Sequence, residues 1–387
     1  MIILNISLNG VKHKFVDLII QGVTENVTID QLSCDEINSV IKYAKYHSVE
    51  NIIYKSLKNA NITIPHDFEK LCMTLFQKAI VQDCEYVEII KQFNSKKIYH
   101  LPLKGAILRK FYPSFELRNM CDLDILVQKS DLKKVNAVLT ELGYLLEKEG
   151  GHHDVYIKSP FMNIEIHRTM LDEEFNNFKY YDNIWKKIIK NNNEYSLELT
   201  NEDFYIYNIV HAWKHFSEGG TGVKILIDIY YILQNNQNLD FEYINFELKQ
   251  IKLDVFAECL YKLTNKLFNN CKLNEDEIFL LDYIIDSGTY GNLTHSSAGG
   301  ILKEEKNSLK FSRGRFLIKR LFPSFKVLKE KYPILENKPI LTPFYWFKRL
   351  FSVLFDKNRR NGYLNSLNCV DQSKIDRIKK IKEITNI

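Results

Sequence analysis

The chain has 387 residues, of which 45% are hydrophobic and 26% are charged. This composition is typical of a folded globular protein and excludes a disordered or fibrous chain, and the length allows two or three domains. The net charge of +5 accompanies Lys, Asn and Ile residues that are abundant throughout, which indicates a compositional bias more than a basic patch.

Cysteine usage and hydropathy predict a cytoplasmic protein. The seven cysteines are odd in number and scattered, without a CxxC pair, so we expect neither a disulfide framework nor a zinc ribbon. Residues 1–15 lack the basic start and the cleavage site of a signal peptide. No later stretch is apolar for the length of a bilayer, so we expect no transmembrane segment.

Residues 1–95 show helical periodicity. Apolar residues recur at helical spacing from Phe68 to Ile80, and Pro65 lies where the first turn of a helix tolerates proline. We therefore expect this region to form a helical N-terminal cap.

Residues 96–180 change to a mixed pattern, which predicts a small α/β palm. Its central strand carries Asp122 and Asp124 and continues as an apolar run through Val127. The other expected elements are a strand over 96–103, a short helix over 106–111, a helix from a Ser130 cap to Gly143, and two strands over 152–158 and 162–168 joined by a turn over 159–161.

Residues 181–387 are expected to be mostly helical, with breaks at 217–222, 287–292 and 322–344. The loop over 217–222 resembles a phosphate cradle but lacks the GK[ST] ending and a preceding strand, so we expect a helix–helix turn. The run FYWFKRLFSVLF over 344–355 fits either a helix on a membrane surface or a helix at the edge of the core, and we favour the core.

The acid pair is the strongest chemical signal in the chain. Because side chains alternate along a strand, Asp122 and Asp124, separated by Leu123, point to the same face. Two parallel carboxylates can bind a hard divalent cation such as Mg²⁺ or Mn²⁺, which takes its remaining ligands from water and substrate phosphates. The pattern therefore indicates phosphate chemistry.

A third carboxylate follows on a later strand. If Ile164 and Ile166 enter the core, Glu165 faces the opposite side, together with His167. Three carboxylates suffice for two-metal phosphoryl or nucleotidyl transfer. The alternative is a solvated surface pair and an exposed strand glutamate, which the glycine turn upstream and the order of the elements disfavour.

These residues carry a family resemblance. The segment from Leu101 to Arg168 resembles the nucleotidyltransferase superfamily of the DNA polymerase β type, which has a glycine turn, a D-x-D strand and a later carboxylate strand. More narrowly, the chain resembles a bacterial family of uncharacterised nucleotidyltransferases. The matching residues are Leu103-Lys104-Gly105, Arg118, Asp122-Leu123-Asp124, Ile164 to Arg168, His211, Lys214-His215, Gly222 and Asp228.

The resemblance implies a Mg²⁺- or Mn²⁺-dependent transfer of a nucleoside monophosphate from a nucleoside triphosphate such as ATP. The implied residues are Asp122, Asp124 and Glu165 for catalysis and metal binding, Lys104, Gly105 and Arg118 around the triphosphate, and His167, His211 and His215 at the cleft. Ala106 departs from the superfamily pattern, because a Ser or Gly there is usual, and the missing hydroxyl removes one donor to phosphate.

Two of these positions admit other roles. Arg118 can contact phosphate or pair with a carboxylate that holds its loop, and the sequence does not decide between them. His211 and His215 have the spacing of a helical zinc pair, but Ala212 replaces the glutamate base of a zinc peptidase and no third ligand is evident, so we do not expect zinc.

The sequence thus predicts an α+β protein with a nucleotidyltransferase palm between two helical regions. The alternatives are a GT-A-like glycosyltransferase that uses the DxD, and a catalytically silent binding protein of the same fold. Basic residues are mostly interleaved with acids, and the run from Lys374 to Lys382 fits one face of a solvated helix. We therefore favour a small-molecule or protein acceptor over nucleic acid, with a toxin-like RNA-modifying enzyme as the variant.

Overall fold

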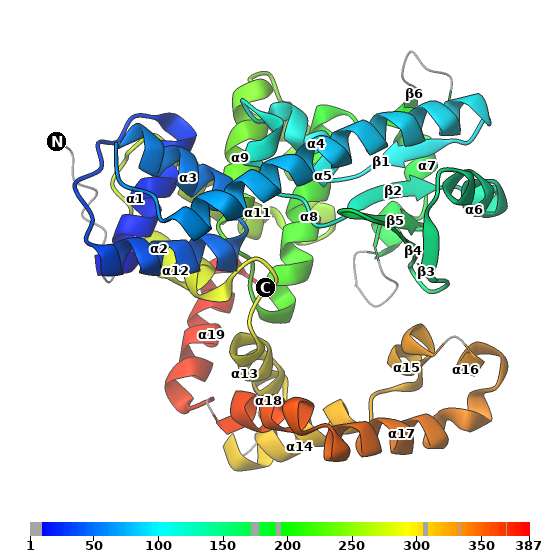
Figure 1. The fold of residues 1–387 in the computed structure, drawn as a ribbon. Coiled ribbons are helices and arrows are strands. Elements are labelled where there is room, and N and C mark those ends of the chain that lie inside the picture. Colours follow the sequence, from blue (N-terminus) through cyan, green and yellow to red (C-terminus); the bar gives the residue numbers. More distant parts are fainter. Residues whose placement is uncertain (1–9, 172–177, 191–194, 305–308, 333, 369) are drawn as a thin grey trace.

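The computed structural model describes residues 10–171, 178–190, 195–304, 309–332, 334–368 and 370–387. A mixed sheet is flanked by helices from both ends of the chain, which confirms the α+β class (Figure 1). Among the described residues, no helix combines the length and the hydropathy that a bilayer crossing requires. Residues 1–9, which belong to the segment expected to lack signal-peptide features, and Cys369 lie outside the described residues.

Four helices make up the N-terminal region. Ser33 begins the second with a capping box, in which its hydroxyl accepts from the backbone N–H of Glu36 and the Glu36 carboxylate accepts from the backbone N–H of Ser33. Pro65 precedes the fourth, in which Phe68 and Cys72 are buried, as the periodicity predicts, whereas Phe76 and Ile80 are exposed. The four are α1 (Gly10–Thr24), α2 (Cys34–His47), α3 (Glu50–Asn59) and α4 (His66–Ser95).

The sheet has five strands: β1 (His100–Pro102), β2 (Leu123–Val127), β3 (Leu145–Lys148), β4 (His153–Lys158) and β5 (Met162–His167). Their order is β1-β2-β5-β4-β3, and only the central pair β2 and β5 is parallel among the paired strands of this sheet. The helices of this region are α5 (Gly105–Leu108), α6 (Leu132–Glu141) and α7 (Ile184–Lys187). A separate two-stranded ribbon pairs β6 (Ile189–Lys190) with β7 (Leu197–Glu198).

Alternation along the two central strands separates a core face from a site face. Leu123 and Ile125 on β2 and Ile164 and Ile166 on β5 are fully buried in one cluster with residues of α4 and α6. Residues between them, such as Asp124, point to the opposite face of the sheet. The apolar run therefore stabilises the sheet and at the same time sets the direction of the acids.

Two expectations for the palm need correction. Ser130 does not cap a helix, because residues Lys129–Asp131 form a 3₁₀ turn and α6 begins at Leu132. The strand β3 was not predicted, since all four of its side chains are exposed and it lacks the alternation that marks a half-buried strand. The helix over 105–111 is split into α5 and a 3₁₀ turn (Arg109–Phe111), close to the predicted range.

Most of the C-terminal helices share a hydrophobic core with α1 to α3 of the cap, so the first and third expected regions pack against each other. A turn joins two of them as predicted, but it spans 220–223, because α8 continues to Gly219 and α9 begins at Lys224. These helices are α8 (Asn201–Gly219), α9 (Lys224–Asn235), α10 (Phe241–Gln250), α11 (Asp254–Phe268), α12 (Glu275–Ser287), α13 (Leu293–Lys303) and α19 (Gln372–Thr385).

A separate group of helices extends along the lower edge of the molecule in Figure 1. It comprises α14 (Leu309–Leu321), α15 (Phe325–Lys331), α16 (Ile334–Asn337), α17 (Thr342–Phe355) and α18 (Lys357–Asn368). The core position favoured for residues 344–355 is wrong, because no side chain of α17 is buried. The expected break over 322–344 also contains the short helices α15 and α16.

Candidate active site

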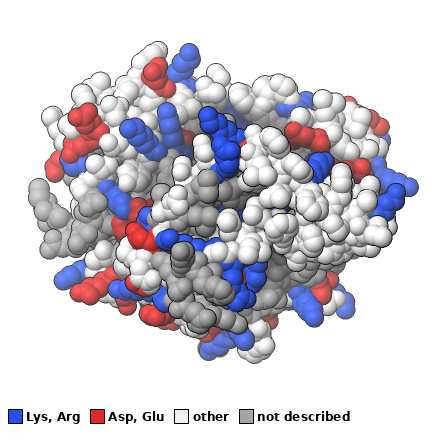
Figure 2. Space-filling view, turned by 90° about the horizontal axis from the view of Figure 1, so that it is seen from below, with Lys and Arg blue, Asp and Glu red and all other residues white. Residues whose placement is uncertain are grey.

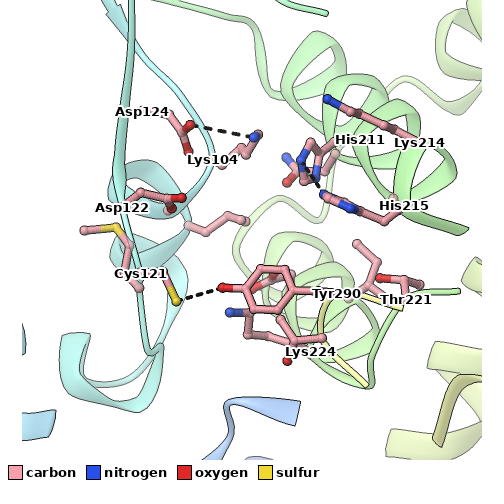
Figure 3. A pocket seen from close by; sticks show the side chains of 18 of the residues that line it. Lys104, Cys121, Asp122, Asp124, His211, Lys214, His215, Thr221, Lys224 and Tyr290 are labelled. Carbon is pink, nitrogen blue, oxygen red and sulfur yellow. Dashed lines mark hydrogen bonds and ion pairs between the residues drawn. The ribbon is translucent and has the colours of Figure 1, made fainter. Parts of the chain in front are cut away.

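A cavity of about 310 Å³ lies between the site face of the sheet and helices α8 and α9 (Figure 3). Its wall includes all nine residues singled out from the sequence. They are Lys104, Gly105, Arg118, Asp122, Asp124, Glu165, His167, His211 and His215. The structure therefore brings together residues that are spread over more than a hundred positions of the chain.

Strand register positions the central acids. Asp124 on β2 is the direct partner of Glu165 on the parallel strand β5, so the two side chains are neighbours on the site face. Nε2 of His167 donates to Oδ1 of Asp124 at 2.7 Å and lies 3.4 Å from Oε2 of Glu165. Ligand atoms of these three residues all lie within 4.8 Å of one another. They form one of two groups among the described residues that can surround a metal ion.

The groups around Asp124 keep its carboxyl group ionised. Burial raises the pKa of the Asp124 carboxyl, but Lys104 and the hydrogen bond from His167 outweigh burial and bring this pKa below its usual value. The Lys104 Nζ lies 3.8 Å from Oδ1 of Asp124. Burial also lowers the pKa of His167, and its hydrogen bonds to Asp124 and Glu165 reverse that effect, so this pKa is raised. The carboxylate is therefore charged, and it lies between the Lys104 ammonium group and the His167 imidazole.

Asp122 precedes β2 and lines the same cavity, with its carboxylate on the same side as that of Asp124 in Figure 3. Burial and the neighbouring carboxylates of Asp124 and Glu165 raise the pKa of Asp122 to about 6. It is not part of the tight group formed by Asp124, Glu165 and His167. The two aspartate side chains thus point the same way, but the pKa of Asp122 is raised and the pKa of Asp124 is lowered.

The turn before the first short helix brings Lys104 to the acids. Lys104 has a φ of +36°, which is uncommon for a residue with a side chain and is a form of local strain often found at functional sites. Gly105 is required by close packing, because a Cβ there would lie 2.5 Å from Sδ of Met120. The sequence signal LKG therefore has a steric explanation in this structure.

Arg118 pairs with a carboxylate, the second of the two roles considered from the sequence. Its Nε and Nη2 donate to Oδ1 and Oδ2 of Asp228 on α9 at 2.8 and 3.0 Å. Tyr112 donates its hydroxyl to the same carboxylate at 2.7 Å. Arg118 and Asp228 are both buried, so this bidentate pair fixes the loop before Asp122 to α9.

The same loop is braced by the cap and by α9. Gln82 of α4 donates to the carbonyl of Met120 at 3.1 Å, and Asn119 donates to Glu50 of α3 at 2.6 Å. Lys224 Nζ donates to the carbonyl of Asn119 at 3.2 Å. Helices far from the palm in sequence therefore fix the position of Asp122.

Two neighbouring histidines, which were not among the residues predicted from the sequence, extend the site. His152 Nε2 lies 3.1 Å from Nδ1 of His167, and His153 Nε2 lies 3.6 Å from Oε2 of Glu165. His152, His153 and His167 form the second group that can surround a metal ion. The register of the β4–β5 hairpin pairs His153 with His167, and this local signal could have revealed the cluster.

The wall opposite the acids comes from the helices. His211 and His215, one turn apart on α8, approach each other with their Nε2 atoms 3.1 Å apart (Figure 3). Burial lowers the pKa of His215 to about 4, with Lys104 and Lys214 acting in the same direction. Both rings are therefore neutral near pH 7, since the pKa of His211 is also strongly lowered by burial.

Tyr290 closes another part of the cavity wall. Its hydroxyl donates to Sγ of Cys121 at 2.8 Å, so the loop after α12 touches the residue that precedes Asp122 (Figure 3). Burial and this hydrogen bond raise the pKa of Tyr290, which is therefore a neutral donor. No sequence pattern marks this contact, because it joins segments 169 residues apart.

Comparison with known proteins identifies a family for the chain. A family model described as "Uncharacterised nucleotidyltransferase" matches residues 33–269, which include every residue of the site described above except Tyr290. No curated protein and no solved structure matches the chain. The match covers more than half of the chain, so the protein belongs to this family of nucleotidyltransferases.

Proposed function

We propose that this protein transfers a nucleoside monophosphate from a nucleoside triphosphate to a hydroxyl acceptor in a divalent-metal-dependent reaction. The observation that carries the proposal is the cross-strand pairing of Asp124 with Glu165 on the face that borders the cavity. The family match supports nucleotidyl transfer over a glycosyltransferase that uses the same DxD.

The donor set fits a divalent ion. Asp124 and Glu165 would hold it, with Asp122 beside them, where burial and the two neighbouring acids raise the pKa of Asp122 to about 6. Carboxylate oxygens suit Mg²⁺ or Mn²⁺, and the adjoining imidazole of His167 adds a ligand type that Mg²⁺ rarely uses. A bound ion supplies positive charge against the phosphate oxygens and lowers the pKa of an acceptor hydroxyl.

We assign the triphosphate to the cationic side of the cavity. Lys104 would neutralise phosphate charge, and Gly105 would let the backbone approach closely. Arg118 would act on this side by holding the loop before Asp122, because Asp228 neutralises its charge. Lys224, half-buried at the same wall, is a further candidate that no sequence motif marks.

The remaining residues have roles toward the acceptor. Glu165 is the candidate base, because His167 and His153 lower its pKa against the effect of burial and keep it ionised. His211 and His215 lie on the helical wall, where neutral imidazoles can donate or accept one hydrogen bond. A cavity of about 310 Å³ suits a nucleotide with a small-molecule or protein hydroxyl.

The six described cysteines are free, which supports a cytoplasmic location.

Label transfer tests the proposal. The chain is incubated with α-³²P-labelled nucleoside triphosphates, Mg²⁺ or Mn²⁺, and a cell extract, and the labelled product is separated. We expect label on an acceptor, and Glu165→Gln should retain triphosphate binding but lose turnover by several orders of magnitude, because the acceptor oxygen loses its base and a metal ligand.

Glu147→Gln is the matched control, because Glu147 is an exposed glutamate of the same sheet. Its transfer rate should equal that of the wild type. A loss smaller than roughly tenfold in Glu165→Gln, about 1.4 kcal/mol of barrier, would remove Glu165 from the reaction.

A further inference from the structure

The basic residues are not spread evenly, contrary to the expectation from composition. We call residues 309–368, which contain α14 to α18, the C-terminal arm. The arm has 14 Lys and Arg against 3 Asp and Glu, a net charge of +11. The rest of the chain has 39 Lys and Arg against 45 Asp and Glu, a net charge of −6. The charge of the protein is thus divided between a basic arm and an acidic body.

The arm also exposes a row of large apolar side chains. On α17, Phe344, Phe347, Phe351 and Leu354 recur at intervals of three and four residues, so they share one helix face. Each of these four is at least 50% exposed, and Phe355, which follows on the same face, is 81% exposed. The opposite side of the helix packs within the arm, where Trp346 donates to the carbonyl of Pro323.

Positive charges flank this apolar face. Lys338 is exposed just before α17, Lys348 is exposed beside the row, and Lys357 and Arg360 are exposed just after it. Figure 2 views the molecule from the side on which the arm lies, and a broad uncharged area there has Lys and Arg side chains at its border. Apolar and cationic groups therefore occupy the same outer surface.

We propose that the C-terminal arm binds the protein peripherally to an anionic membrane surface. The apolar face of α17 would lie in the interface, with its phenylalanines among the acyl chains and with Lys and Arg at the acidic headgroups. The helix would lie in the membrane plane, because none of the described helices can span a bilayer. This role is independent of the nucleotidyl transfer proposed above.

Charge and chemistry favour this occupant over two others. A second copy that packed arm against arm, as in a symmetric dimer, would bring two segments of charge +11 together, which is unfavourable. Single-stranded RNA would use aromatic rings for stacking, but Leu354, Ile340 and Ile318, all at least half exposed on the arm, offer no ring. Aliphatic and phenylalanine side chains bordered by lysines are what a lipid interface accommodates.

Vesicle co-sedimentation of the full chain tests the proposal. We expect binding to vesicles of phosphatidylcholine with phosphatidylglycerol and none to phosphatidylcholine alone. Phe347→Glu with Phe351→Glu should weaken this binding at least tenfold, because two charges would enter the apolar interface. Lys338→Gln with Lys348→Gln should weaken it roughly 30-fold, at about 1 kcal/mol for each cation near an anionic surface.

The matched control is Val87→Glu with Phe246→Glu, which makes the same charge change at two apolar side chains of the body that are 59% and 60% exposed. It should bind vesicles like the wild type, and all variants should retain triphosphate binding.

Three results overturn the proposal. One is the absence of wild-type binding to anionic vesicles, and another is an equal loss in the control variant. The third is a different occupant of the apolar face. This would be a second copy if the protein is a dimer that dissociates in Phe347→Glu with Phe351→Glu while vesicle binding stays. It would be RNA if the protein retains RNA in a salt-sensitive way and does not bind vesicles.

Discussion

The two aspartates of the site ionise differently although one residue separates them. Lys104 and His167 surround Asp124 and lower its pKa, whereas Asp122 is buried beside carboxylates and has a pKa near 6. A cation bound between these groups would remove the difference, because it favours the charged form of both. A bound divalent ion should therefore lower the pKa of Asp122.

His47 shows how one buried imidazole joins distant helices. Its Nε2 donates to the carbonyl of Ile285 on α12 at 2.9 Å, and its Nδ1 accepts from the backbone N–H of Val223 at 3.3 Å. The ring must be neutral to do both, and burial lowers the pKa of His47 to about 4. Because this pKa lies below that of the unfolded chain, the stabilisation is complete above about pH 6.5 and is lost as the pH falls toward 4.

This predicts a pH-dependent gap between the wild type and His47→Gln. The free energy of unfolding, measured with urea, should favour the wild type at pH 7, and the gap should shrink by about 2 kcal/mol between pH 6.5 and pH 5, at 1.36 kcal/mol for each pH unit. His66→Gln, at an exposed histidine, is the control and should follow the wild type. A gap that does not change with pH would contradict the assigned role of His47.

At the scale of elements, the buried pair of Arg118 and Asp228 holds the loop before β2 against α9. Asp228→Ala leaves the Arg118 guanidinium buried without its carboxylate, which typically costs 3–5 kcal/mol. We expect a loss of this size in the free energy of unfolding. Glu242→Ala, at an exposed acid of the next helix, should change it by less than about 0.5 kcal/mol. Similar values for the two variants would show that the pair does not stabilise the loop.

Local patterns predicted those parts of the site that strand geometry determines. Alternation around Ile164 and Ile166 gave the direction of Glu165, and the apolar run after Asp124 gave its strand. The contact between Arg118 and Asp228 joins residues 110 positions apart, so the sequence offered two roles for Arg118 without a choice. The parallel register that makes Asp124 and Glu165 direct partners also depends on how distant segments fold together.

The arm shows the limit of hydrophobic periodicity. The pattern of α17 predicts a helix with one apolar face, and the structure has that helix. Periodicity does not tell whether protein, lipid or water covers the face, because all three arrangements need the same spacing. The exposure of Phe347 and Phe351 became evident only from the packing of the arm.

At the scale of the whole molecule, the cap and most C-terminal helices share one core, and the palm contributes the acids on the other side of the cavity. Glu50 and Gln82 from the cap and Lys224 from α9 all contact the loop that carries Asn119 and Met120. The helical body therefore does more than cover the palm, since it fixes the loop from which Asp122 projects.

The central claim is that the acid pair makes nucleotide binding depend on a divalent ion, and one measurement tests it directly. The affinity for a fluorescent nucleoside triphosphate is titrated with and without Mg²⁺ in the wild type and in Asp122→Asn with Asp124→Asn. We expect Mg²⁺ to increase the wild-type affinity and to have no effect on the double variant. Asp122→Asn relieves repulsion, whereas Asp124→Asn removes the buried partner of Lys104 and His167, so circular dichroism must show that the double variant is folded. Asp35→Asn with Asp67→Asn, at exposed aspartates, should behave like the wild type. Unchanged Mg²⁺-dependent affinity in the site variant would contradict the account.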